Sequence, residues 1–171
     1  LEYLEHTVTR VPDKVAFAND VMGLTFRETY DQARAVGSFL HSEGFYKQPV
    51  VVFMKKHPTT LVSFFGTIYS GNYYVPLDDE MPSHRIDLIL RTLKPQAMIC
   101  DEDTQELVKQ FAYEGKTYIF SEICHTPVNE EALASIRDKQ IDTDPIYIVF
   151  TSGSTGVPKG VTACHRSVLD Y

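Results

Sequence analysis

Short apolar runs alternate with segments of helical periodicity along the whole chain. The apolar runs predict strands at 50–54, 73–77, 97–100, 117–120, 145–151 and 160–164. Apolar residues at helical spacing predict helices at 27–44, 58–69, 83–93, 102–113 and 129–138, and a further helix that starts at 165. Strands joined by helical crossovers form βαβ units, so the pattern predicts an α/β fold with a mostly parallel sheet and helices on both faces.

Two local signals support this assignment. Thr25 followed by Glu28 fits a capping box, and Gly44 is a stop signal, so a helix is expected between them. The run VVVFM at 50–54 is continuously apolar and rich in β-branched residues, which is typical of a strand covered on both faces. A buried parallel sheet is therefore expected.

The length of 171 residues is typical of about one domain. We find no internal repeat, no low-complexity segment and no linker between two domains. If the chain has an inner seam, we expect it in the polar stretch 121–144.

The charge balance excludes some classes of partner. The chain has 16 basic and 23 acidic residues, which gives a net charge of −7, and the basic residues are scattered. A nucleic-acid-binding surface is therefore not expected. The three cysteines, Cys100, Cys124 and Cys164, are widely spaced without a CxxC, so we expect neither a disulfide framework nor a zinc site, and a reducing compartment.

The chain has no segment that predicts a membrane span or a secretory signal. The most apolar stretch, 61–77, contains several polar residues and glycines and is shorter than the about 20 apolar residues that span a bilayer. The first residues lack a basic and an apolar region, so the cytoplasm is the expected location. Because the chain does not begin with Met, we expect that the first residues of the natural protein precede it.

The stretch YIVFTSGSTGVPKG at 147–160 combines small donors, flexible backbone and a cation. The hydroxyls are Thr151, Ser152, Ser154 and Thr155, the glycines are Gly153, Gly156 and Gly160, and the cation is Lys159. Backbone N–H groups at a bend, small hydroxyls and a lysine are the groups that bind phosphates. A polar surface loop is the alternative, but the stretch follows a buried strand, where open α/β sheets bind their ligands.

Two common phosphate-binding motifs do not fit this stretch. In a Walker A loop a glycine would stand at Pro158 and a serine or threonine would follow Lys159, where the chain has Gly160. The spacing of the glycines does not match G-x-G-x-x-G either. The stretch therefore predicts a third kind of phosphate loop.

These residues resemble the adenylate-forming superfamily, which includes the adenylation domains of non-ribosomal peptide synthetases, acyl-CoA synthetases and luciferases. Thr151 to Gly160 matches the signature loop T/S-S-G-S/T-T/S-G-x-P-K-G at every defined position. LTFRETY at 24–30 is similar to the motif LTYxEL, and IYSGNYYVPLDDEMPSHRI at 68–86 to xKAGxAYVPLDPxxPxxRI, with a few departures in packing segments. The form of the second motif resembles the amino-acid-activating branch, both peptide-synthetase domains and the D-alanine–carrier protein ligases of teichoic acid alanylation.

The resemblance implies a reaction in two steps. An amino-acid carboxylate attacks the α-phosphorus of ATP, which gives aminoacyl-AMP and pyrophosphate, and the acyl group then passes to the phosphopantetheine thiol of a carrier protein. It assigns Thr151, Ser152, Gly153, Ser154, Thr155, Gly156, Lys159 and Gly160 to the β- and γ-phosphates, with Lys159 as the catalytic cation. Mg²⁺ is expected to be held mainly by phosphate oxygens and water, with no protein metal ligands predicted. The glycines also predict a mobile loop that closes over bound nucleotide.

The resemblance also implies a division of the enzyme. Residues 1–171 correspond to the N-terminal part of the large adenylation domain, and the C-terminal lid domain is absent. Later segments of the family supply the adenine, ribose and substrate contacts and a second catalytic lysine, so the chain alone is expected to be inactive. Two alternatives remain open here, an acyl-CoA synthetase-type ligase and a folded fragment without catalytic function.

Other reactive residues have simpler interpretations. His165 and Arg166 at the start of the last helix are interpreted as capping or surface residues rather than an acid–base pair. The acidic run 78–80 is interpreted as a solvated turn rather than a metal site. Cys164 is predicted to be a small buried residue rather than a nucleophile, because no base is identified for it.

Overall fold

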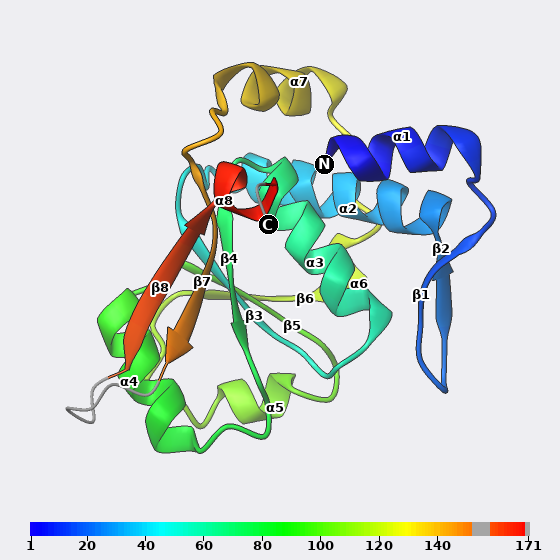
Figure 1. Cartoon of the computed structure of the whole chain (residues 1–171). Coiled ribbons are helices and arrows are strands. Elements are labelled where there is room, and N and C mark those ends of the chain that lie inside the picture. Colours follow the sequence, from blue (N-terminus) through cyan, green and yellow to red (C-terminus); the bar gives the residue numbers. More distant parts are fainter. Residues whose placement is uncertain (152–157, 170–171) are drawn as a thin grey trace.

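The computed structural model describes residues 1–151 and 158–169, which contain a six-stranded sheet between helices (Figure 1). Its strands are β3 (Pro49–Phe53), β4 (Tyr73–Leu77), β5 (Ala97–Cys100), β6 (Lys116–Ile119), β7 (Pro145–Thr151) and β8 (Lys159–Cys164). The strand order is β6-β5-β3-β4-β7-β8, and all neighbours are parallel except β8, which is antiparallel to β7. The predicted α/β class with a mostly parallel sheet is confirmed.

The remaining elements are eight helices and a short strand pair within the described residues. The helices are α1 (Glu2–Arg10), α2 (Phe26–Ser42), α3 (Pro58–Tyr69), α4 (Ser83–Leu93), α5 (Gln105–Val108), α6 (Phe120–Ile123), α7 (Glu130–Lys139) and α8 (His165–Leu169). The strand pair is β1 (Val15–Ala18) and β2 (Gly23–Thr25), which are antiparallel. None of these helices is both long enough and apolar enough to cross a membrane.

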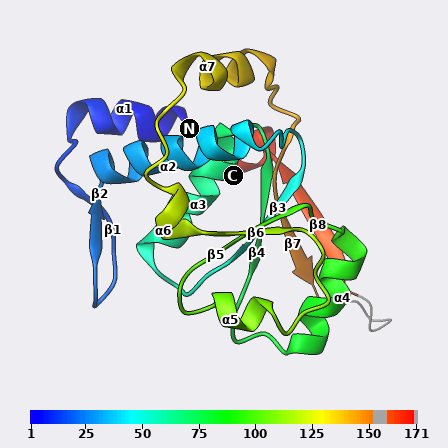
Figure 2. The same ribbon diagram turned by 180° about the vertical axis from the view of Figure 1, so that it is seen from behind.

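The central strand β3 is buried along its whole length. Its alternate residues Val50 and Val52 pack with α2 and α3, and Val51 and Phe53 pack with α4 on the opposite face. Figures 1 and 2 show α2 and α3 on one side of the sheet and α4 and α5 on the other. The prediction that the apolar run at 50–54 is covered on both faces is confirmed.

The capping box at the start of α2 is also confirmed. The Thr25 hydroxyl accepts a hydrogen bond from the Glu28 N–H at 3.1 Å, and the Glu28 carboxylate accepts one from the Thr25 N–H at 2.8 Å. These bonds satisfy donors that would otherwise be free at the first turn. The helix ends at Ser42, and Gly44 follows with a φ of +85°, which glycine adopts easily.

The helices α2 and α3 approach each other closely at two glycines. A Cβ on Gly66 would lie 2.6 Å from the Cβ of Val36, and a Cβ on Gly37 would lie 2.7 Å from the Cβ of Tyr69. Neither distance is compatible with normal packing, so the absence of side chains at both positions sets the separation of the two helices.

The predicted helix at 102–113 is wrong in its length, because only Gln105–Val108 is helical. The N–H of Ala112 donates to the Asp87 carboxylate of α4 at 3.1 Å instead of continuing the helical ladder. The Phe111 ring packs against the Phe53 ring with centroids 5.5 Å apart. Phe111 and Ala112 therefore make tertiary contacts instead of extending the helix that local periodicity predicted.

The sequence pattern missed α1 and the β1–β2 pair. Both strands are short, and β1 has no alternation of buried and exposed residues. Phe17 of β1 packs against Phe65 of α3 with ring centroids 6.2 Å apart. Contacts with distant residues, rather than local periodicity, hold this strand pair.

The stretch 121–144 does not form a seam between two units. Ile123, Leu133 and Ile136 from this stretch are buried in the same hydrophobic core as α2 and α3. Arg137 of α7 also donates to both carboxylate oxygens of Glu5 in α1 at 2.7 Å. The described residues therefore share a continuous structure in which α1 and α7 lie outside α2.

Candidate functional site

The end of β7 and the start of β8 bring together two of the residues predicted to bind phosphate. Thr151 is paired with Lys159 in the antiparallel register, and the Thr151 hydroxyl lies 3.4 Å from the Lys159 carbonyl oxygen. Directly opposed residues of an antiparallel pair project from the same face. Both residues are exposed, so a hydroxyl and an ammonium group share one accessible face at the end of this hairpin.

Gly160, the third predicted residue that the structure describes, lies opposite Phe150. A Cβ at this position would lie 2.9 Å from Cγ2 of Ile148 and 3.3 Å from Cζ of Phe150. The glycine therefore lets β8 lie close to side chains that pack into the core beside α4. The other predicted residues, Ser152, Gly153, Ser154, Thr155 and Gly156, and the predicted loop mobility lie outside the described residues.

The charges around this hairpin end are unbalanced. Among the described residues, Lys159 forms no ion pair with a carboxylate, and neither does Arg85 of α4. Arg85 Nη2 donates to the Phe150 carbonyl at 3.4 Å, one residue before Thr151. Two cations without acidic partners favour an anionic ligand. The sequence analysis did not select Arg85 as a site residue. Arg85 is the arginine of the RI pair that ends the motif at 68–86.

A cavity of about 700 Å³ lies beside Phe150, at the carboxyl ends of β3, β4 and β7. Its apolar lining includes Met54 and Leu77, and His57 contributes a polar group whose Nδ1 lies 2.8 Å from Nδ2 of Asn19. Ligand cavities in proteins have volumes of about 300 to 1,000 Å³. The sequence did not predict this cavity, which is built from segments far apart in the chain.

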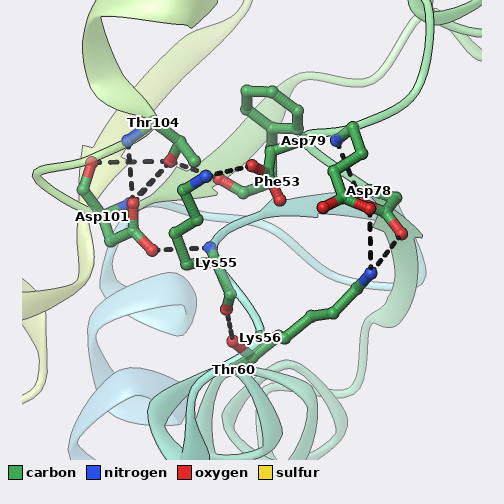
Figure 3. Close-up of polar contacts among 9 residues, drawn as sticks. Phe53, Lys55, Lys56, Thr60, Asp78, Asp79, Asp101 and Thr104 are labelled. Carbon is green, nitrogen blue, oxygen red and sulfur yellow. Dashed lines mark hydrogen bonds and ion pairs between the residues drawn. The ribbon is translucent and has the colours of Figure 1, made fainter. Parts of the chain in front are cut away.

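Hydrogen bonds fix the backbone where β3 ends (Figure 3). The buried Asp101 carboxylate accepts from the Lys55 N–H at 2.7 Å and from the Thr104 N–H at 2.8 Å. The Thr104 hydroxyl lies 2.7 Å from the Phe53 carbonyl oxygen and 2.8 Å from Oδ1 of Asp101. These contacts join the ends of β3 and β5, so the edge of the sheet that carries the cavity is held in a fixed arrangement.

The acidic run 78–80 forms a turn, as predicted, but it is not solvated throughout. The Asp79 carboxylate is only 8% exposed and pairs with Lys55, whereas Asp78 is half-exposed and pairs with Lys56 at 3.0 Å (Figure 3). The Glu80 N–H bond and the Lys56 ammonium lower the pKa of Asp78, and the bond to Asp79 raises the pKa of Lys55. The carboxylates are used in ion pairs, and no group of three metal-ligating side chains is found among the described residues.

The residues at the other end of β8 lie away from Lys159. Arg166 Nε donates to the Asp142 carboxylate at 2.8 Å, and His165 is half-buried, which lowers its pKa by desolvation. This agrees with the interpretation that they are not an acid–base pair. The prediction that Cys164 is buried is wrong: it is only partly buried, because β8 is the edge strand of the sheet.

Comparison with known proteins supports the family resemblance inferred from the signature loop. The sequence model of the family described as AMP-binding enzyme matches residues 4–171. The chain is 30% identical to the D-alanine–D-alanyl carrier protein ligase of Listeria monocytogenes serotype 4b, over 100% of this chain and 34% of that protein. It is 28% identical to tyrocidine synthase 3 of Brevibacillus parabrevis, over 99% of this chain and 2% of that protein.

A solved structure shows the same fold. The nonribosomal peptide synthetase FmoA3, in its alpha-methyl-L-serine-AMP bound form, superimposes with a TM-score of 0.83 at 22% identity, over 99% of this chain and 18% of that chain. The chain thus spans about a third of the length of the Listeria ligase that it matches. The family match over nearly all of its residues shows that this chain belongs to the AMP-binding enzyme family.

Proposed function

We propose that these residues are the N-terminal part of the large adenylation domain of an amino-acid–carrier protein ligase that forms aminoacyl-AMP from ATP. The observation that carries the proposal is the signature stretch Thr151 to Gly160, which follows β7 at the carboxyl edge of a mostly parallel sheet. The family match over residues 4–171 supports it. The 34% share of the Listeria ligase supports the proposal that a longer enzyme contains this chain.

The proposed chemistry is a displacement at phosphorus followed by acyl transfer. A carboxylate oxygen of the amino acid attacks the α-phosphorus of ATP, and the bond to the bridging oxygen breaks, which releases pyrophosphate. The thiol of a carrier-protein phosphopantetheine then attacks the carbonyl carbon of aminoacyl-AMP and releases AMP. The first step needs positioning and stabilisation of the charge that builds up on pyrophosphate.

In this proposal the hairpin end stabilises the departing pyrophosphate. The Lys159 ammonium supplies a positive charge, and the Thr151 hydroxyl on the same face would exchange its hydrogen bond to the Lys159 carbonyl for one to a phosphate oxygen. Ser152, Gly153, Ser154, Thr155 and Gly156 complete the proposed set with hydroxyls and backbone N–H groups. Gly160 is proposed to act through its small size, because a Cβ there would displace Ile148 or Phe150.

Mg²⁺ is proposed to enter with the triphosphate. Magnesium in nucleotide sites keeps several waters and is bound through phosphate oxygens with one or two protein groups. The cation would neutralise phosphate charge, while Lys159 and Thr151 orient the leaving group.

The proposed substrate is an amino acid, with D-alanine as the first candidate and a carrier protein as the acceptor. The relatives in both branches of the resemblance support this proposal, since one is named as a D-alanine–carrier ligase and the other as a peptide synthase. The two are almost equally similar to this chain, so the test must compare substrates directly.

The test is ATP–pyrophosphate exchange by the full-length enzyme that contains this chain, assayed with D-amino acids, L-amino acids and fatty acids. Exchange that depends on an amino acid supports the proposal, and the preferred amino acid identifies the substrate. Exchange with fatty acids alone would show an acyl-CoA synthetase-type ligase instead. Transfer of the radiolabelled amino acid to a phosphopantetheinylated carrier, but not to its unmodified form, tests the second step.

A further inference from the structure

Arg85 occupies a position that helix stability does not explain. It is the third residue of α4, in the first turn, whereas Arg91 is in the last turn of the same helix. The helix dipole disfavours a cation at the N-terminus and favours one at the C-terminus. A residue that breaks such a local rule often serves the tertiary structure or the function.

The contacts of Arg85 lead to the end of β7. Its Nη2 donates to the Phe150 carbonyl at 3.4 Å, and its buried Nε has no partner among the described residues. A guanidinium usually pairs with a carboxylate when it is partly buried, yet Arg85 forms no such pair within the described residues. Among the described residues, the guanidinium of Arg85 therefore bonds to the backbone that precedes Thr151.

The end of β7 needs support from outside the sheet. The hydrogen-bonded register between β4 and β7 contains the single pair Tyr74 and Tyr147, and Pro76 of β4 has no N–H to extend this ladder. Beyond that point the described strand partner of β7 is the edge strand β8. Figures 1 and 2 both show α4 beside the end of β7 and the start of β8. Arg85 is the residue of α4 that bonds to this end of the hairpin.

We infer that Arg85 is a positioning residue of the pyrophosphate site, because it holds the Phe150 carbonyl and thereby fixes Thr151 and Lys159 at the end of the hairpin. The inference rests on the proposed function of Thr151 and Lys159. The neighbouring Ile86 is 1% exposed and packs in the same core as Phe150, so the helix that carries Arg85 is firmly anchored. The bond thus connects a rigid helix to the strand end where the reactive groups stand.

Two variants separate the hydrogen bond from the bulk of the side chain. Arg85→Met keeps an apolar stem and loses every donor, and Arg85→Lys keeps a donor. Arg91→Met on the exposed face of α4 is the matched control. Hydrogen exchange is measured on the full-length enzyme that contains this chain, with the amides of β3 and β5 as the internal standard of folding.

We expect Arg85→Met to raise exchange at the amides of Val149 to Thr151 and of their β8 partners by about 5-fold, the effect of losing one hydrogen bond with a long donor–acceptor distance. Arg85→Lys should restore most of the protection, and Arg91→Met should leave it unchanged. Equal protection in wild type and Arg85→Met would overturn the inference. So would an equal loss in the Lys and Met variants, because the donor would then have no role.

The second readout uses the full-length enzyme. Arg85→Met should raise the KM for pyrophosphate in the exchange assay by about 10-fold and leave the KM for the amino acid unchanged. A changed hydrogen exchange with an unchanged KM for pyrophosphate would show a purely structural residue and overturn the inference. If the wild-type enzyme shows no exchange with any substrate, the proposed function fails instead, and direct binding of pyrophosphate to wild type and Arg85→Met still decides the role of Arg85.

Discussion

Thr151 and Lys159 are eight positions apart in the sequence but directly opposite each other where β7 ends and β8 begins, and the threonine hydroxyl donates to the lysine carbonyl at 3.4 Å. The pairing gives both side chains the same face and leaves both exposed. The Thr151 hydroxyl and the Lys159 ammonium therefore lie side by side on an accessible face. This arrangement is the structural basis of the predictions about the phosphate site.

The first prediction concerns the loss of the positive charge of Lys159. Lys159→Ala in the full-length enzyme should lower amino-acid-dependent exchange by about 100-fold, the usual effect of losing one group that stabilises developing charge. The free energy of unfolding should change by less than about 0.5 kcal/mol, because the side chain is exposed and forms no ion pair within the described residues. Exchange kinetics and urea unfolding measure the two effects.

Lys139→Ala is the matched control for Lys159, since Lys139 is an exposed lysine on α7. It should leave exchange unchanged. Wild-type rates in the Lys159 variant would remove this residue from the proposed site, and equal losses in both variants would indicate a general charge effect.

The second prediction concerns the activity of the isolated 171-residue chain. Residues 1–171 should show no amino-acid-dependent ATP–pyrophosphate exchange, because they span only 34% of the length of the Listeria ligase and the resemblance places the remaining nucleotide contacts in later segments. The full-length enzyme in the same assay is the positive control. Exchange by the isolated chain above the background without protein would contradict the division that we propose.

The contact between α2 and α3 gives a prediction on stability. Gly66→Ala gains about 1 kcal/mol of helix propensity. However, its Cβ would lie 2.6 Å from Cβ and Cγ1 of Val36 and 3.0 Å from the backbone oxygen of Ala33, so the overpacking penalty should be about 2–3 kcal/mol. We expect the free energy of unfolding to decrease by about 1–2 kcal/mol, measured by urea unfolding.

A second substitution tests the cause. Val36→Gly removes both the Cβ and the Cγ1 that the new Cβ would meet, so the double variant should be more stable than the sum of the two single changes allows. Gly23→Ala is the control, because the nearest atom to its Cβ would lie at 3.6 Å. A Gly66→Ala protein as stable as wild type would show that the two helices are able to separate at no cost.

The capping box of α2 gives a prediction on pH. The Thr25 N–H and hydroxyl hold the pKa of Glu28 below its ordinary value of 4.5. A carboxylate with a lowered folded-state pKa stabilises fully above its unfolded pKa, and this stabilisation is lost as the pH falls through the folded value. Glu28→Gln should therefore lower the free energy of unfolding by about 0.5 kcal/mol at pH 7, because the group is exposed.

The difference between wild type and Glu28→Gln should shrink as the pH falls below 4.5, measured by urea unfolding across this range. Glu114→Gln changes an exposed glutamate in a loop and should show a smaller difference at every pH. A difference for Glu28→Gln that does not depend on pH would mean that the charge of the capping carboxylate has no role.

Local patterns predicted the elements whose apolar residues repeat regularly. The run Val50 to Phe53 and the pair Thr25 and Glu28 both have the structure that the sequence indicated. The pattern failed at 102–113, where Ala112 and Phe111 make contacts with α4 and β3 that no local rule contains. It also failed for Asp79, whose burial depends on Lys55 in another loop.

The sequence by itself determined the fold class, the family and the residues of the signature stretch, because periodicity and motif spacing are properties of neighbouring positions. Only the tertiary structure decided that Thr151 and Lys159 share a face, that Arg85 reaches the Phe150 carbonyl, and that a cavity of about 700 Å³ lies beside Phe150. The physical reason is that strand register and helix packing join residues distant in the chain, and their energies depend on the whole core rather than on local preference.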